Sequence, residues 1–130
     1  MAKTINQVVF FDTTPATVYN ALMDSKTHGE FTNTKAEISQ DVGGAFSTYD
    51  GYITGTNVEL VPNEKIVQSW HASDWKEDEI STVTYELEEV EGKTKLTFTH
   101  ADVPDEKCDD IEKGWEDYYW KPMRELFAKN

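Results

Sequence analysis

Apolar and polar residues alternate with a period of two along most of the chain between residues 35 and 100. The alternation is plainest in the segments 80–90 and 93–100, where one face carries apolar side chains and a histidine and the other carries Thr, Lys and Glu. The apolar face consists of Val83, Tyr85, Leu87, Leu96, Phe98 and His100. This pattern predicts strands of an antiparallel sheet with one buried and one solvent-exposed face.

Turn-forming dipeptides divide this region into separate strands. Asp50-Gly51 is the strongest signal, because a two-residue hairpin turn needs positive φ angles, which Asp and Gly tolerate. A further strand is expected at 3–12, which is rich in β-branched and aromatic residues. We therefore expect six or seven antiparallel strands. Those after the first fall at 35–42, 45–50, 51–61, 65–72, 80–90 and 93–100.

Helical periodicity replaces the alternation in two places. After the first strand, Thr14-Pro15 is typical of a helix start, and Asp24-Ser25 begins a second short helix that reaches about Phe31. The chain after Pro104 carries a longer apolar stripe, in which Pro122 is expected to produce a kink because it lacks an N–H group. The stripe consists of Ile111, Trp115, Tyr118, Tyr119, Met123, Leu126 and Phe127.

This order of elements predicts an α+β fold in which a curved sheet covers a long C-terminal helix. The length of 130 residues fits one domain, which we expect to span 1–130. Four Trp, six Tyr and six Phe supply enough apolar area for a packed core, so a disordered chain is not expected.

The charge narrows the range of partners. The formal net charge of −13 opposes binding to phosphate backbones and anionic membranes. We interpret the acidity mainly as a source of solubility, with a partner that has a basic surface as the less favoured alternative. No segment approaches the length of a transmembrane span, and no secretory signal is recognisable, so we expect no membrane insertion and a cytoplasmic location. Cys108 is the only cysteine and can form no disulfide within the chain.

Catalytic and metal-binding motifs do not emerge from the sequence. The three histidines, His28, His71 and His100, lack the spacing of a metal site, and no nucleotide-binding or nucleophile motif is present. We therefore expect no cofactor, no metal and no enzymatic activity. His100 is interpreted as a histidine of the core or of a cavity mouth, with proton transfer as the less favoured alternative.

A set of short motifs, considered in order and spacing, resembles one known family. These are Gly43-Gly44 with Phe46; Asp50-Gly51 with Ile53 and Gly55; Glu59-Leu60 with Pro62-Asn63; Lys65 to Gln68 with Trp70; and Gly114-Trp115 with Tyr118-Tyr119. Together with the opening strand and the segment TPATVYNAL, they make the chain similar to the C-terminal domain of the activator of the heat-shock-protein-90 ATPase. The resemblance covers nearly the whole chain.

The resemblance implies the helix-grip fold of the START-like, birch-pollen-allergen-like (SRPBCC) superfamily, with a cavity between sheet and helix. It also implies a non-enzymatic, co-chaperone-like module that contacts a chaperone. In eukaryotic activators a separate N-terminal domain supplies much of that contact, and a chain of this length is not expected to hold both.

Two other functions remain open. One is a carrier or sensor of a small apolar ligand, because large aromatic side chains facing a concave sheet can line a pocket as well as fill a core. The other, ranked last, is an enzyme that uses His100 as a base. For the ligand site, the expected cavity wall consists of Phe46, Trp70, Tyr85, Phe98, His100, Trp115 and Tyr119.

Overall fold

The computed structural model describes residues 2–32, 34–77 and 79–128. The chain opens with one strand and two short helices: β1 (Ala2–Phe11), α1 (Pro15–Met23) and α2 (Ser25–Thr32). The remaining strands are β2 (Glu37–Ile38), β3 (Ala45–Thr48), β4 (Ile53–Val61), β5 (Lys65–Ala72), β6 (Ser81–Val90) and β7 (Lys93–Pro104). The C-terminal helical segment comprises a 3₁₀ turn η1 (Asp105–Lys107), α3 (Cys108–Trp115), a π-helical turn η2 (Glu116–Trp120) and α4 (Lys121–Ala128).

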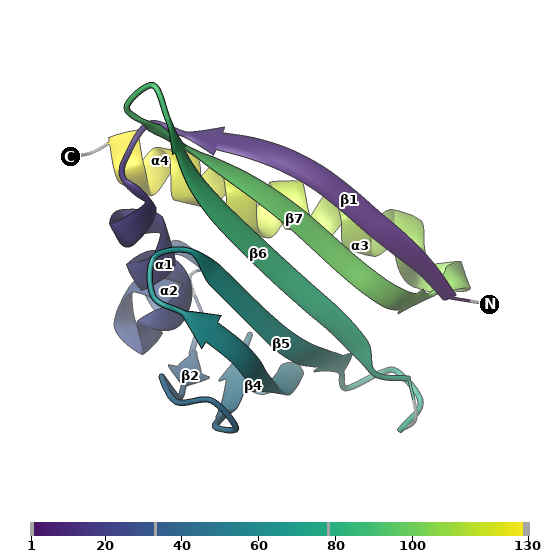
Figure 1. Cartoon of the computed structure of the whole chain (residues 1–130). Coiled ribbons are helices and arrows are strands. Elements are labelled where there is room, and N and C mark those ends of the chain that lie inside the picture. The colour runs from purple at the N-terminus through teal and green to yellow at the C-terminus, as the bar shows by residue number, and fades with distance from the viewer. Residues whose placement is uncertain (1, 33, 78, 129–130) are drawn as a thin grey trace.

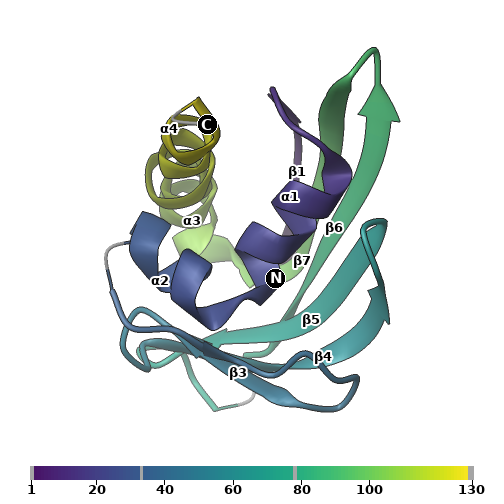
Figure 2. The ribbon, with the colours of Figure 1, turned by 90° about the vertical axis from the view of Figure 1, so that its left-hand side faces the viewer.

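The strands form one antiparallel sheet in the order β1-β7-β6-β5-β4-β3-β2. The sheet curves around the C-terminal helical segment, and α1 and α2 lie on the same concave side (Figure 2). The two ends of the described chain lie at opposite ends of the molecule (Figure 1). The α+β helix-grip fold expected from the sequence is confirmed.

Several strand boundaries differ from the prediction. Strand β2 has two residues instead of the eight expected at 35–42. The chain turns after Ser39: Gly44 N–H donates to the Asp41 carbonyl, and the Asn57 side-chain amide donates to the carbonyls of Ser39 and Asp41. The turn between β3 and β4 has four residues, since Thr48 pairs directly with Ile53. It therefore takes Tyr49 and Tyr52 out of the strands in which they were expected.

The C-terminal helical segment is distorted just before Pro122. Proline has no N–H to donate to the carbonyl of Tyr118, four residues earlier, and that carbonyl accepts a hydrogen bond from the Tyr49 hydroxyl at 3.2 Å. The distortion takes the form of the η2 turn, where Lys121 N–H donates to the carbonyl of Glu116, five residues back. Five-residue spacing brings Trp115 and Trp120 onto one side of the helix, with their rings stacked at 5.6 Å.

Close packing of β3, β4 and β5 depends on Gly55. A Cβ atom at this position would overlap the carbonyl oxygen of Ser69 and come within 2.6 Å of Phe46 Cε2. Gly114, in α3, is different: a Cβ there would meet only the Tyr118 ring, at 3.6 Å. The sheet therefore does not require glycine at position 114.

His28 joins α2 to the C-terminal helical segment. The Leu22 carbonyl, 3.1 Å from Nδ1, can only accept, so Nδ1 carries the proton and Nε2 accepts from the Tyr119 hydroxyl at 2.9 Å. Burial lowers the pKa of His28 to about 4 and raises the pKa of Tyr119 above its ordinary value. Both side chains are therefore neutral at physiological pH, as this pair of hydrogen bonds requires.

We predict that Gly55→Ala lowers the free energy of unfolding by about 3 kcal/mol, because the added methyl meets a backbone carbonyl that cannot move aside. Gly114→Ala is the matched control and should raise the free energy of unfolding by about 1 kcal/mol through helix propensity. Urea unfolding followed by tryptophan fluorescence measures both. A Gly55→Ala protein as stable as wild type would contradict the close approach.

The pH dependence of stability gives a second prediction. The folded-state pKa of His28 lies below its unfolded value, so the unfolded chain takes up this proton first and stability falls as the pH drops below about 6.5. Between pH 7.5 and pH 5 His28 should account for a loss of about 2 kcal/mol. His28→Gln keeps an acceptor for Tyr119 but does not titrate. Between pH 7.5 and pH 5 the variant should therefore lose about 2 kcal/mol less unfolding free energy than the wild type loses. An unchanged pH dependence would contradict the assignment.

Candidate functional site

A groove of about 560 Å³ lies between the sheet and the C-terminal helical segment. The β3–β4 turn, β4 and β5 form one wall, and α3 with η2 forms the other. The sheet side contributes Tyr49, Tyr52, Ile53 and Trp70, and the helical side contributes Asp110, Ile111, Gly114, Trp115, Tyr118 and Tyr119. The groove is thus mostly aromatic and carries one carboxylate.

Trp115 is the central side chain beneath the groove. Its ring centroid lies 4.5 Å from those of both Phe98 and Tyr119, and 5.9 Å from that of Trp70. It is 3% exposed, so it presents only a small part of its surface to the groove while the rest packs into the core. Trp115 therefore belongs to both the core and the floor of the site.

A chain of hydrogen bonds fixes the orientation of Trp115. Its Nε1–H donates to His100 Nδ1 at 3.1 Å, so the proton of His100 is on Nε2, which donates to Ser81 Oγ at 2.7 Å. The Ser81 hydroxyl in turn donates to the carbonyl of Trp70 at 2.8 Å. Burial lowers the pKa of His100 to about 3, which keeps the ring neutral and able to accept from Trp115.

The seven residues expected to form the cavity wall fall into two groups. Trp70, Trp115 and Tyr119 line the groove. The other four are buried and are not among the lining residues: Phe46, Tyr85, Phe98 and His100. Trp115 and Trp120 pack against Tyr85 and Phe98, with Trp120 centred 5.2 Å from Phe98. His100 is fully buried with both ring nitrogens bonded, so it does not reach the groove.

The mouth of the groove contains three tyrosines that were not expected in the cavity wall. Tyr49 and Tyr52 were expected at strand ends, and Tyr118, which is 61% exposed, was counted in the apolar stripe of the helix. Tyr49 and Tyr52 could have been recognised from the sequence, because they lie on either side of the Asp50-Gly51 turn. Tyr49 and Tyr118 face each other at a ring separation of 6.2 Å and form part of the rim.

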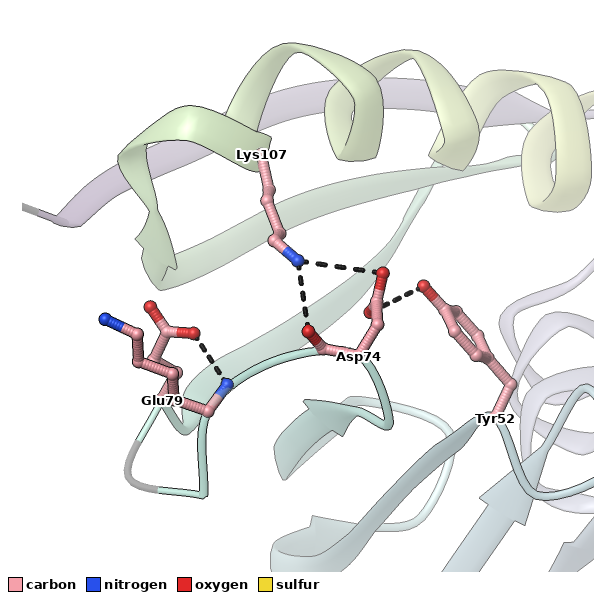
Figure 3. Close-up of polar contacts among 5 residues, drawn as sticks. Tyr52, Asp74, Glu79 and Lys107 are labelled. Atoms are coloured by element: carbon pink, nitrogen blue, oxygen red, sulfur yellow. Dashed lines mark hydrogen bonds and ion pairs between the residues drawn. The ribbon is translucent and has the colours of Figure 1, made fainter.

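The groove ends in a polar corner. A smaller cavity of about 250 Å³ shares Tyr52, Trp70, Asp110 and Ile111 with the groove and is also lined by Asp74 and Lys107. Asp74 lies between Tyr52 and Lys107 (Figure 3): the Tyr52 hydroxyl donates to its carboxylate at 2.8 Å, and Lys107 Nζ lies 3.6 Å from the other oxygen. The hydrogen bond from Tyr52, aided by Lys107, lowers the pKa of Asp74.

The described residues include no group of three or more His, Cys, Asp or Glu side chains placed to hold a metal ion. In the same part of the chain, no helix has the length and apolar character needed to span a bilayer. Cys108 is buried at the start of α3, and this burial raises its pKa. The side chains that line the groove and its polar corner offer aromatic contact, tyrosine hydroxyls, two carboxylates and the Lys107 ammonium group.

The chain is similar to known proteins along nearly its whole length. It is 28% identical to the human activator of 90 kDa heat shock protein ATPase homolog 1 over 118 residues, which are 91% of this chain and 35% of that protein. The chain thus spans about a third of the length of the curated relatives it matches.

Solved structures extend the similarity to the fold. A crystal structure of an HSP90 activator from Plasmodium falciparum superposes with a TM-score of 0.92 at 28% identity, covering 96% of each chain. The Aha1 dimer from Colwellia psychrerythraea shares the fold, with a TM-score of 0.83 at 16% identity and 96% of each chain covered. The family described as Activator of Hsp90 ATPase homolog 1-like protein matches residues 12–128, and the chain belongs to this family.

Proposed function

We propose that this protein is a non-enzymatic binding module that stimulates the ATPase of an HSP90-type chaperone. The observation that carries the proposal is the match, over 96% of both chains, to the HSP90 activator from Plasmodium falciparum. Because the match covers 96% of this chain, it supports a working surface formed by the residues of the helix-grip fold.

The distribution of charge supports the helical side as the contact surface. Its acidic segment, residues 105–117, exposes six carboxylates: Asp105, Glu106, Asp109, Asp110, Glu112 and Asp117. On the outer face of the sheet, by contrast, acidic and basic residues face each other across strands, as Glu88 faces Lys95 and Glu86 faces Lys65. A basic partner would be attracted mainly to the acidic segment.

We predict that the protein binds the HSP90-type chaperone of its own host and raises its ATPase rate, more strongly at low salt than at high salt. Asp109→Asn combined with Glu112→Gln should weaken binding about fivefold, because it removes two charges from the acidic segment. Glu86→Gln combined with Glu88→Gln makes the same change of charge on the outer face and should have little effect. Absence of both binding and stimulation at low salt would refute the proposal.

A second proposed function is the binding of a small apolar ligand in the groove. The volume of about 560 Å³ and the aromatic walls favour it, since pockets of this size and composition hold small organic molecules. Gly114 lies in the helical wall where a larger side chain has room to project, so the groove can be filled without disturbing the core.

We predict that native mass spectrometry of the protein purified from its own host detects a bound small molecule. Gly114→Leu should remove it by occupying the groove, while keeping or raising stability through helix propensity. Gly114→Ala adds only a methyl group and should retain the adduct. An adduct that survives Gly114→Leu, or a wild-type protein without any adduct, would count against this function.

A further inference from the structure

The groove presents an unusual density of aromatic surface. Tyrosine or tryptophan side chains stand on both walls: Tyr49, Tyr52 and Trp70 on the sheet side, and Trp115, Tyr118 and Tyr119 on the helical side. Aromatic faces attract cations as well as apolar groups, and the attraction is stronger where water is excluded. The walls alone are therefore compatible with a neutral apolar ligand or with an organic cation.

The charges around the groove distinguish between these two ligands. Lys107 is the cation at the polar corner, and its Nζ is bound to Asp74 through both the carboxylate, at 3.6 Å, and the backbone carbonyl, at 3.3 Å (Figure 3). Asp110 lines both the groove and the corner, and within the described ranges no basic side chain pairs with it. The charge at the site that no neighbouring group in the described chain balances is therefore the negative charge of Asp110.

An anionic ligand would be repelled by Asp110 and would have to displace Asp74 from Lys107. A neutral apolar ligand would cover aromatic surface but would partly remove water from Asp110 without replacing its interactions, which costs free energy. A ligand with a positive charge on an apolar body fits both the negative charge of Asp110 and the aromatic walls. Its charge can lie near Asp110 and against tyrosine faces, while its apolar body covers Trp70 and Trp115.

We propose that the groove selects organic cations with an apolar body, such as aromatic or branched quaternary ammonium compounds. The inference rests on the ligand-binding function proposed for the groove and is independent of chaperone binding. Asp110 would supply the charge that discriminates between ligands, and the aromatic walls would supply contact area.

The test compares two probes of the same shape, benzyltrimethylammonium and its uncharged carbon analogue neopentylbenzene. Titration followed by the fluorescence of Trp70 and Trp115, and checked by calorimetry, should show the cation binding about tenfold more tightly than the analogue. The preference should weaken with added salt, because a screened carboxylate attracts the cation less.

Three variants test whether Asp110 causes the preference for the cation and whether both probes bind in the groove. Asp110→Asn should reduce the preference for the cation several-fold, because it weakens binding of the cation and lowers the cost of desolvation that neopentylbenzene meets at this position. Glu88→Gln removes the same charge from the outer face of the sheet and should preserve the preference. Gly114→Leu should abolish binding of both probes, which places them in the groove.

The possible outcomes distinguish failure of cation selectivity from failure of the ligand-binding function. Equal affinity for the two probes would overturn cation selectivity while leaving an apolar ligand site in place. Loss of selectivity in Glu88→Gln as large as in Asp110→Asn would also overturn it, since the effect would then reflect net charge alone. Failure of both probes to bind would overturn the inference, and the native adduct would decide the ligand-binding function separately.

Discussion

The hydrogen bond from Trp115 to His100 is the interaction on which the rest of the structure depends. It joins the C-terminal helical segment to strand β7, and it forms only while His100 is neutral, because a protonated ring has no lone pair to accept the indole N–H. Burial keeps the ring neutral. The other ring nitrogen of His100 donates to Ser81 Oγ, and the Ser81 hydroxyl donates to the backbone carbonyl of Trp70. His100 thus fixes the Trp115 side chain by a hydrogen bond, and its ring also lies against the Trp70 ring at a centroid distance of 4.7 Å.

The π-helical turn divides the aromatic residues between core and groove. By placing Trp120 beside Trp115, it closes the layer that covers Phe98 and Tyr85, and leaves Tyr118 exposed at the mouth. Pro122 explains why the distortion occurs where it does, and the Tyr49 hydroxyl bonds the carbonyl that proline leaves without its usual partner. Helix distortion and groove shape thus have a common origin.

The sequence predicts the elements well, because a period of two and a helical stripe are local signals. Strands β4 to β7 and both short helices occur within a few residues of expectation. The cavity wall was only partly predictable, since Tyr85 and Tyr119 have the same aromatic character and differ only in what covers them. Pairings such as Asp74 with Lys107, 33 residues apart, depend on the folded chain and leave no pattern in the sequence.

The central claim is that the protein works through its helical side, with the acidic segment and the groove, and not through the outer face of the sheet. Chemical-shift mapping by NMR during titration with the host chaperone tests this most directly. The claim predicts that shifts concentrate in residues 105–119 and in the turn 49–52, while Val8, Phe10 and Glu88 on the outer face stay unchanged. Shifts concentrated on the outer face of β1, β6 and β7 would contradict it.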